Sequence, residues 1–392
     1  MDFTPTQEQA AAQGLAARIF GDLATHERLA AAGGDSDPEL WKALCAAGLL
    51  EAVEETGLLG LVLLAEEQGR TTAQVPFTAS AVYGLLAVAR HGTDEQRARL
   101  LPGLRDGTTV VTGAFPDTGR IRAEAGGPGG GGLLTGTVDW VPWLRDATHV
   151  LLPDQDAALW LVPLSPAAGR APSGAVPGTS PSPETGAASE PAPPAVTVTP
   201  VELTAPWAAG RLVLDGAPGE RLGDGAGGAG GAGGAAGAAG AAVRACVLAA
   251  ARIAFAGLQA GVCAGSLARA VAHTTVREQF GRPLATRQAV QLRAADAYMD
   301  TEAIRVTAYE AAWRHDRSLP AEEHALTAAW WASEAGKRVV HAGQHLHGGM
   351  GADLDHPVHR HFLWGRQLDA YLGCGTELLA ELGDLLAKGE PS

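Results

Sequence analysis

Arginine is concentrated in one stretch of a chain that is acidic as a whole. The 392 residues carry a net charge of −14, yet no aspartate or glutamate lies between Asp224 and Glu278. This stretch and the residues after it carry Arg244, Arg252, Arg269, Arg277, Arg282, Arg287 and Arg293. A forked guanidinium binds phosphate oxygens in pairs. We therefore expect the region to bind a polyanion such as a dinucleotide or coenzyme A.

A second candidate site is the glycine-rich segment His347-Gly348-Gly349-Met350-Gly351. Closely spaced glycines let a backbone approach a ligand because no Cβ stands in the way. A glycine pair also suits a plain turn between helices, and that alternative stays open. Histidines cluster nearby, and His341 and His345 have the i, i+4 spacing of a metal-binding pair. No cysteine or carboxylate arrangement completes such a site, so we expect no metal.

The two segments together resemble the signatures of the acyl-CoA dehydrogenase family. The first runs from Arg277 to Leu284 as Arg-Glu-Gln-Phe-Gly-Arg-Pro-Leu and is followed by Gln288. The second is the glycine segment, with Pro357-Val358 and then Tyr371-Leu372-Gly373 after it. The resemblance covers most of the chain and is weakest in the middle. It implies an FAD-dependent oxidoreductase of fatty acid or steroid metabolism that acts on the CH–CH group of an acyl-CoA and passes electrons to an electron-transfer acceptor.

The resemblance also implies which residues lie at the cofactor. In the family the arginine matched by Arg277 binds the FAD diphosphate or adenine end, often that of a neighbouring subunit. Taken alone, Arg277 would be interpreted as a helix-end arginine that caps carbonyls, but Phe280, Gly281 and Gln288 beside it favour the ligand. The family's glutamine before the glycine pair corresponds to His345 or to the adjacent Gln344. The implied FAD-binding residues are Arg277, Phe280, Gln288, Gln344, His345, Gly348, Gly349, Gly351, Thr112 and Trp140. Arg252 matches a family arginine near the substrate, and its alternative is a surface helix charge.

The middle of the chain departs from the family pattern at the flavin. The stretch Thr112-Gly113-Ala114-Phe115-Pro116-Asp117 keeps only Thr112 and Asp117 of the family's motif. Trp140 is kept, but Pro142 replaces a hydroxyl residue and has no amide to donate. Half of the FAD site is therefore eroded.

The catalytic base of the family is missing from both of its known positions. A glutamate in these enzymes removes an α-proton while a hydride leaves the β-carbon for the flavin. Here the two positions hold Leu372 and Ala251. Among nearby acids, Glu377 lies about 140° from position 372 on an ideal helix, and Asp369 lies about 60° away. Asp369 is thus the weak candidate for a substitute base, and nothing in the sequence near Cys374 marks it as a thiolate base.

Three interpretations follow from this pattern. The first is a base-lacking subunit that completes the FAD site of a related dehydrogenase subunit in a dimer or tetramer. The second is an active homo-oligomeric enzyme that uses Asp369 or another acid. The third is a non-catalytic acyl-CoA-binding or interaction protein without flavin. The first accounts best for an intact Arg277 and Gly348-Gly349 beside an eroded flavin-ring end.

Composition and charge narrow the class of protein. The acidic net charge argues against nucleic acid as a partner. Cys45, Cys246, Cys263 and Cys374 lack CxxC spacing and indicate reduced thiols, which favours a cytoplasmic protein. We identify no signal peptide and no apolar stretch long enough to span a membrane.

The elements that must position these residues predict a mainly α protein with a central β-domain. An N-terminal helical domain is expected over 1–107, with helix starts at Thr4-Pro5, Asp37-Pro38 and Thr93-Asp94. Strand-like runs predict a small antiparallel β-barrel or sandwich over 108–221, with a disordered insertion at 166–199. Residues 222–242 are a Gly/Ala linker. A C-terminal four-helix bundle over 243–392 is expected, with helices at 243–276, 286–315, 320–343 and 360–388.

Overall fold

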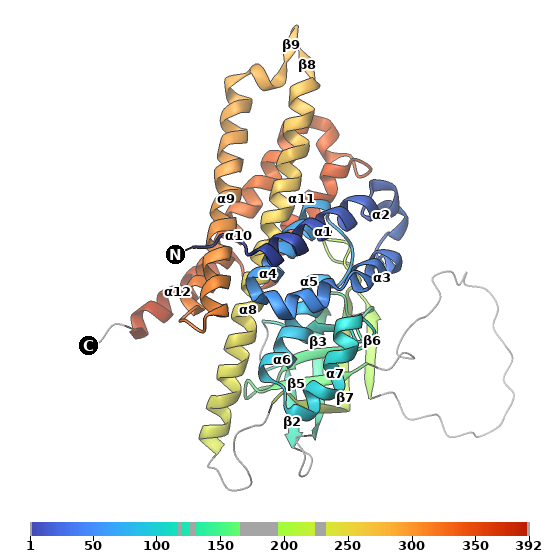
Figure 1. Cartoon of the computed structure of the whole chain (residues 1–392), viewed down its shortest axis with the longest axis vertical. Coiled ribbons are helices and arrows are strands. Elements are labelled where there is room, and N and C mark those ends of the chain that lie inside the picture. The colour runs from blue at the N-terminus through green and yellow to red at the C-terminus, as the bar shows by residue number, and fades with distance from the viewer. Residues whose placement is uncertain (1, 117–118, 126–130, 165–194, 224–232, 390–392) are drawn as a thin grey trace, which may run out of the picture.

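The computed structural model describes residues 2–116, 119–125, 131–164, 195–223 and 233–389. Its three parts follow one another along the chain as expected: N-terminal helices, a central sheet and a C-terminal helical domain (Figure 1). The N-terminal helices are α1 (Gln7–Leu23), α2 (His26–Ala32), α3 (Pro38–Ala46), α4 (Leu49–Thr71), α5 (Phe77–Ala79), the π-helix η1 (Ser80–Leu86), α6 (Ala87–His91) and α7 (Asp94–Asp106).

Helix starts in this part follow the side chains that cap them. Asp37 caps α3 with Pro38 in the first turn, and Thr93 caps α7 in a capping box, as expected from the sequence. The expected start at Thr4-Pro5 is wrong. The cap of α1 is Thr6, because its hydroxyl accepts from the Gln9 amide while the Gln9 side chain accepts from the Thr6 amide.

The central part is one mixed sheet. Its strands are β1 (Val111–Gly113), β2 (Ile121–Ala125), β3 (Gly131–Val141), β4 (His149–Pro153), β5 (Leu159–Pro163), β6 (Val196–Pro200) and β7 (Gly210–Arg221). The strand order is β1-β4-β5-β7-β3-β2, with β6 also on β7. All pairings are antiparallel except β1 with β4, so the expected all-antiparallel barrel or sandwich needs that correction.

The end of the expected insertion belongs to this sheet. Residues 196–199 form most of β6, because alternating Val and Thr pair with β7. The rest of that insertion, residues 166–194, lies outside the described residues. Strands β2 and β7 were not expected from the sequence, since glycine and charged residues interrupt their apolar pattern.

The C-terminal part is longer and more broken than expected. Its elements are α8 (Gly233–Val276), β8 (Glu278–Gln279), β9 (Arg282–Pro283), η2 (Leu284–Thr286), α9 (Gln288–Asp316), α10 (Glu322–His347), η3 (Gly348–Ala352), α11 (Pro357–Tyr371) and α12 (Gly375–Gly389). Residues 233–242, assigned to the linker from sequence, are helical because the alanines among these glycines favour helix. The single helix expected at 360–388 is two helices, broken at Gly373, whose φ is 114°.

Helix α8 lies at the centre of the C-terminal part and packs on α4, α9, α10 and α11. Glycines at helical spacing, Gly257, Gly261 and Gly265, let α4 approach closely. A Cβ on Gly261 would lie 2.0 Å from the Glu66 carbonyl oxygen. Residues 238–276 match a membrane span in length and apolar composition, which the sequence analysis did not detect, but 67% of the tested window is buried inside the protein.

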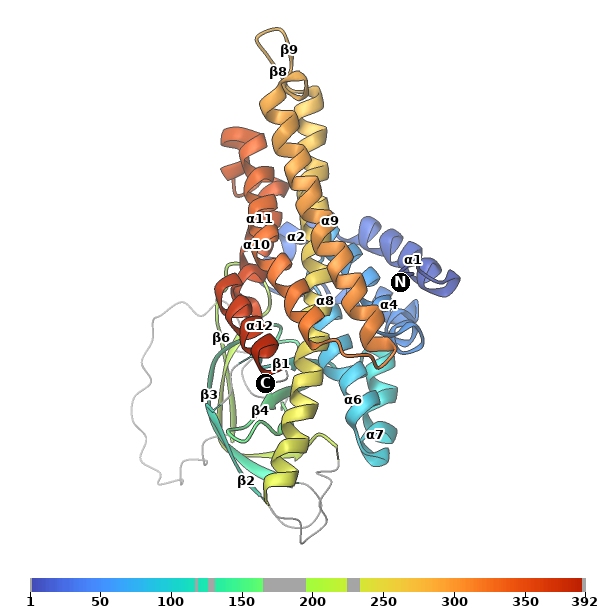
Figure 2. The ribbon, with the colours of Figure 1, turned by 90° about the vertical axis from the view of Figure 1, so that its left-hand side faces the viewer.

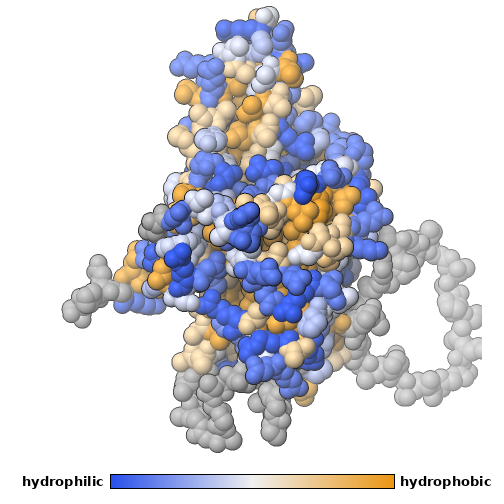
Figure 3. Space-filling model, in the orientation of Figure 1, coloured by the Kyte–Doolittle hydropathy of each residue, from blue (hydrophilic) through white to orange (hydrophobic). Residues whose placement is uncertain are grey.

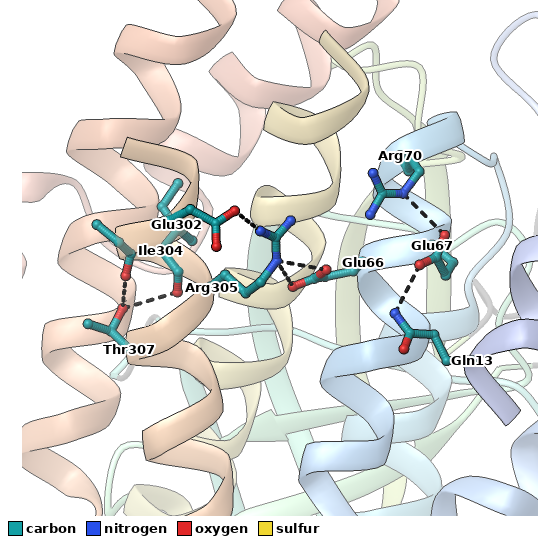
Figure 4. A network of polar contacts seen from close by, with 9 residues as sticks. Gln13, Glu66, Glu67, Arg70, Glu302, Ile304, Arg305 and Thr307 are labelled. Atoms are coloured by element: carbon teal, nitrogen blue, oxygen red, sulfur yellow. Dashed lines mark hydrogen bonds and ion pairs between the residues drawn. The ribbon is translucent and has the colours of Figure 1, made fainter. Parts of the chain in front are cut away.

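A buried ion pair fixes α9 against α4 (Figure 4). The Arg305 guanidinium bonds to the Glu66 carboxylate at 3.1 Å, and Glu302 contacts the same arginine. The Glu66 side chain is only 2% exposed. Burial raises the pKa of Glu66, and the neighbouring Arg305 and Arg70 oppose that rise. The N-terminal and C-terminal helices are therefore held together by charge as well as by apolar packing.

The molecule is elongated, with the sheet and the β8–β9 hairpin at opposite ends (Figures 1 and 2). Helix α8 connects the two ends. At 1.5 Å per residue its 44 residues span about 66 Å. This length decides which of the sequence-predicted residues can meet within one chain.

Candidate functional site

The position of the missing base opens into very little space. Leu372 is 6% exposed and lines a cavity of about 20 Å³ with Phe255 and Tyr371. Such a volume holds about one water molecule. An acyl thioester cannot enter it without displacement of the surrounding side chains.

Arg252, the expected substrate-binding residue, is already paired. Its guanidinium donates two hydrogen bonds to the Glu381 carboxylate, at 2.8 and 2.6 Å, and its Nε donates to the Leu372 carbonyl at 3.4 Å. Sequence analysis missed Glu381, because one continuous helix over 360–388 would not fold back onto α8. The break at Gly373 is what turns α12 toward Arg252.

The candidate substitute base does not face the same cavity. The Asp369 carboxylate accepts a hydrogen bond from the Ser333 hydroxyl at 2.7 Å and lies 3.6 Å from the Arg366 guanidinium. Asp369 is not among the residues that line the cavity at Leu372. Ala251, at the other base position, is fully buried in the apolar core.

Aromatic side chains fill the space between the central sheet and the C-terminal helices. Trp143 and Trp207 stack with centroids 4.4 Å apart, and Trp207 contacts Trp364 and Tyr371 edge to face. Phe255 of α8 contacts Tyr371 at 4.8 Å. These five side chains are at most 4% exposed. This cluster is not predictable from sequence patterns, because its members come from the β3–β4 and β6–β7 connections, α8 and α11.

The flavin-ring residues expected in the sheet are engaged elsewhere. The Thr112 hydroxyl donates to the Pro142 carbonyl at 2.6 Å and is fully buried. Trp140 is half-buried with its ring centroid 5.9 Å from that of Tyr371. A flavin ring between two groups needs about 7 Å, twice a van der Waals contact. The rings of Trp140 and Tyr371 therefore leave no room for a flavin ring between them, and Asp117 lies outside the described residues.

The hairpin that carries the arginine signature has the opposite character. Arg277 and Gln288 are exposed, and Phe280 is 92% exposed at the tip. Phe280 and Gly281 form a two-residue turn with φ of 54° and 75°. The Arg287 guanidinium lies 5.2 Å from the Phe280 ring centroid and bonds to the Gln279 carbonyl. The exposed aromatic ring thus lies against the Arg287 guanidinium.

The glycine segment is also open to solvent. A Cβ added at Gly348 or Gly349 would meet no atom within 4 Å, and Gly348 has a φ of 65°. Gly351 is different, because the Gln344 backbone oxygen would lie 2.3 Å from its Cβ. The Gln344 side chain donates to the Gly351 carbonyl at 3.2 Å, while His345 is exposed. The turn therefore presents bare backbone that a dinucleotide could approach.

Three histidine side chains lie close together beside this turn. His347 stacks on His273 of α8 at 4.8 Å and contacts His356 at 4.9 Å. Burial, followed by the charge of His347, lowers the pKa of both His273 and His356. Within the described ranges no three histidine, cysteine or acidic side chains are placed to hold a metal ion.

The structure thus divides the sequence-predicted residues into two sets. Arg277, Phe280, Gln288 and the glycine turn belong to the C-terminal half around the hairpin. Thr112 and Trp140 lie in the sheet at the other end (Figure 1). Arg252 precedes Arg277 by 25 residues along α8, about 37 Å. One chain does not bring the two sets to a common flavin.

The family models, the curated relatives and the solved structures that match this chain include acyl-CoA dehydrogenases in each case. Family models match the acyl-CoA dehydrogenase N-terminal domain over residues 6–108 and the C-terminal domain over residues 238–380. The chain is 33% identical to the acyl-CoA dehydrogenase FadE27 of Mycobacterium tuberculosis over 410 residues, 99% of each protein. Among solved structures, a variant of the Tcur3481–Tcur3483 steroid ACAD is 37% identical, with a TM-score of 0.82 over 98% of each chain. The ChsE4–ChsE5 complex from Mycobacterium tuberculosis is 30% identical, with a TM-score of 0.82 over 100% of each chain.

Proposed function

The chain belongs to the acyl-CoA dehydrogenase family, and on that premise we propose that it is the base-lacking subunit of a hetero-oligomeric dehydrogenase. The family comprises FAD-dependent oxidoreductases that act on CH–CH groups. In this proposal the C-terminal half of the chain completes the FAD site of a related subunit, and that subunit supplies the glutamate. The carrying observation is the contrast between an open hairpin and a closed space at the chain's own base position.

The hairpin has the chemistry that a neighbour's FAD requires. Arg277 offers a forked cation to a diphosphate. Phe280 offers an exposed apolar ring, and Gly348 with Gly349 offers backbone without a Cβ. A bound FAD would supply the hydride acceptor, while these residues would hold its adenine and diphosphate end.

An extended apolar surface supports assembly with another subunit. Val276, Leu292 and Met299 are 77, 58 and 61% exposed on the upper part of α8 and α9. Leu292 and Met299 line a groove of about 690 Å³, together with Arg338 and His341 of α10. Apolar side chains cover this region below the polar hairpin (Figure 3). Monomers seldom expose contiguous apolar patches of this kind.

Two of the similar solved structures bear on the substrate class. One is a steroid ACAD, and the other is the ChsE4–ChsE5 complex. We propose by this likeness that the substrate is a steroid-derived acyl-CoA thioester and that the assembly is a dimer or tetramer of two related subunits. The thioester would react in the partner's cavity, because the cavity at Leu372 has room for about one water.

The first experiment compares the absorbance spectrum of the protein alone with that of its complex with a related subunit carrying the family glutamate. We expect flavin absorbance only in the complex, and bleaching when a steroid acyl-CoA is added. Flavin bound and bleached by the chain alone would overturn the proposal and favour an active homo-oligomer. An absence of flavin in both would favour a binding protein.

Two variants separate the proposal from an enzyme that uses Asp369. Asp369→Asn should leave turnover of the complex unchanged. If Asp369 were the catalytic base, the same substitution would make the complex inactive. Ser333→Ala is the matched control, because it removes the same buried hydrogen bond without altering the carboxylate.

Arg277→Ala should lower flavin retention in the complex at least tenfold, which corresponds to about 1.4 kcal/mol. Arg18→Ala, an exposed arginine on α1, is the control for a general charge effect.

A further inference from the structure

A second cavity lies on a different face of α8 from the base position. It has a volume of about 250 Å³ and lies where α4, α6, α8 and α9 meet. Cys246 lines it, six residues before Arg252 and about 240° around an ideal helix from it. The polar side chains of its lining are Glu54, Arg90, His91, Cys246, His315 and Asp316. None of them takes part in the site described above.

Three of these side chains form a Cys–His–Asp series. The Cys246 sulfur lies 3.8 Å from His315 Nε2, within hydrogen-bond reach for sulfur. On the other side of the ring, His315 Nδ1 lies 3.7 Å from an Asp316 carboxylate oxygen. That nitrogen is buried and makes no hydrogen bond. The imidazole is therefore placed to take the thiol proton at Nε2, which the Arg90 guanidinium also approaches to 3.3 Å, while Asp316 faces its opposite edge.

The carboxylate of this series is held by backbone. Asp316 accepts hydrogen bonds from the amides of Leu58 and Leu59 at 2.8 and 2.9 Å. These amides are free because Gly57, with a φ of 73°, interrupts α4 just before them. A Cβ on Gly57 would lie 2.8 Å from the carboxylate. The kink and the acid therefore depend on each other.

Around the Cys246 sulfur, the acidic side chains are paired with other groups, and the nearby charge without such a partner is positive. Glu54 is occupied by a two-point bond to Arg105, and Asp316 by its two amides. Arg90 is exposed, and its guanidinium lies 3.3 Å from His315 Nε2. Burial alone raises the pKa of the Cys246 thiol, but hydrogen bonds from His315 and His91 and the charges of His91 and Arg90 outweigh it and lower the pKa to about 6.

Two of the other cysteines, Cys45 and Cys263, lack this environment. Burial raises the pKa of Cys45 to about 11, and burial also raises that of Cys263 well above the ordinary range. Cys263 is fully buried, whereas Cys246 is partly accessible. The chain thus contains internal standards of low reactivity.

We propose that Cys246 is a modification site, whose thiolate exchanges with low-molecular-weight disulfides that enter the α4–α6–α8–α9 cavity. The Cys246 sulfur attacks one sulfur of the disulfide, a new S–S bond forms, and the other half leaves as a thiolate. The thiol proton passes to His315 and then to solvent or the leaving thiolate. The incoming disulfide is the only oxidant, and a thiol reverses the step. This site goes beyond the proposed dehydrogenase function and does not rest on it.

The size and charge of the cavity define the class of disulfide. A volume of about 250 Å³ accommodates one small half of a disulfide. Arg90 and His91 favour a half that carries a carboxylate. The probes are therefore 3,3′-dithiodipropionate, which is anionic, and 2-hydroxyethyl disulfide, which is neutral and of similar size.

The decisive measurement is the pH dependence of alkylation at each cysteine of the full chain. Iodoacetamide labelling between pH 5 and 10, followed by peptide mass spectrometry, should give a midpoint near 6 for Cys246. His315→Gln should move this midpoint upward and slow labelling at pH 7 at least tenfold, with the same limiting rate at high pH. A Cys246 midpoint in the ordinary range near 8.5, or one that His315→Gln leaves in place, would overturn the proposal.

The exchange itself is tested with the two disulfides. The anionic probe should add to Cys246 at least threefold faster than the neutral one, and a dithiol should remove it. Arg90→Gln should abolish that preference, and Cys246→Ser should abolish the adduct. Thermal melting of each variant reports whether the fold is kept. Gly57→Ala serves as a second route to the same result if His315→Gln unfolds, because it displaces Asp316 without altering either reacting side chain. Modification of Cys45 or Cys374 in preference to Cys246 would contradict the assignment.

Discussion

Phe280 offers a substitution that separates folding from assembly. Its side chain is 92% exposed, so the isolated chain gains almost no burial from it. Its φ of 54° places a bulky residue in the left-handed region, at a cost of about 1–2 kcal/mol. Phe280→Asn creates Asn-Gly, the preferred pair for a two-residue hairpin turn with both φ positive. The isolated chain should therefore keep its stability or gain up to about 1 kcal/mol.

The same substitution should weaken the complex that we propose. Burial of a phenylalanine side chain stabilises by about 1.5–3 kcal/mol, and this contribution is available only from a partner. The dissociation constant of the complex, or of its flavin, should rise about 10- to 100-fold. Loss of the contact with Arg287 adds little, because an exposed cation–π contact contributes about 0.5–1 kcal/mol.

Two measurements on the same preparation test this reasoning. Urea unfolding of the isolated chain gives its stability, and flavin fluorescence during titration of the partner gives the affinity. Leu386→Asn, at a leucine of α12 that is 48% exposed, is the control for loss of any exposed apolar side chain. A destabilised monomer, or a complex with unchanged affinity, would refute the assignment of Phe280 to a docking contact.

Three further predictions concern the framework that holds the site. Arg305→Met should lower the free energy of unfolding by about 3–5 kcal/mol, because it leaves the buried Glu66 carboxylate unpaired. Adding Glu66→Gln should recover part of this loss in urea unfolding. An equal loss in the single and double variants would count against the pairing. Gly261→Ala should cost about 1–3 kcal/mol, because its Cβ would meet the α4 backbone, whereas Gly14→Ala, with open space around it, should be neutral or slightly stabilising in the same assay. Burial lowers the pKa of His361 to about 4, so the unfolded chain binds the proton first. The contribution of neutral His361 to the free energy of unfolding is fully present above about pH 6.5, and about 3 kcal/mol of it is lost as the pH falls toward 4. His361→Gln should reduce this dependence of the unfolding free energy on pH when unfolding is measured across that range.

Local chemistry made parts of the fold predictable from the sequence. Asp37-Pro38 and Thr93 marked helix starts because a capping side chain and the amide it binds lie within three residues. The boundaries of α8 and α11 were missed for a related reason. The Gly/Ala pattern before Val243 favours helix only weakly, because its glycines offset the helix preference of its alanines. Gly373 ends α11 through a φ of 114° that composition alone does not specify.

The candidate site was predictable where a motif is contiguous and unpredictable where contacts join distant segments. The hairpin from Arg277 and the glycine turn were found from sequence and are open, as a ligand-binding role requires. The pairing of Arg252 with Glu381 was not, because 129 residues separate them. The aromatic cluster of Trp143, Trp207 and Trp364 was missed for the same reason, since each ring comes from a different segment.

The length and packing of helix α8 lead to a prediction about the number of FAD molecules bound per pair of subunits. It is straight enough in both views, and packed on four other helices, to keep the hairpin away from the sheet of its own chain (Figures 1 and 2). If two related chains pair about a pseudo-twofold axis, each hairpin reaches the flavin-ring end of the other chain. Our chain would then complete the partner's site, whereas the partner's hairpin would meet the closed space beside Tyr371 and Trp140. One FAD per pair is therefore expected, against two per pair for a homodimer of ordinary subunits. A measured ratio of two would mean that the aromatic cluster opens in the complex and that both ends of the chain bind flavin.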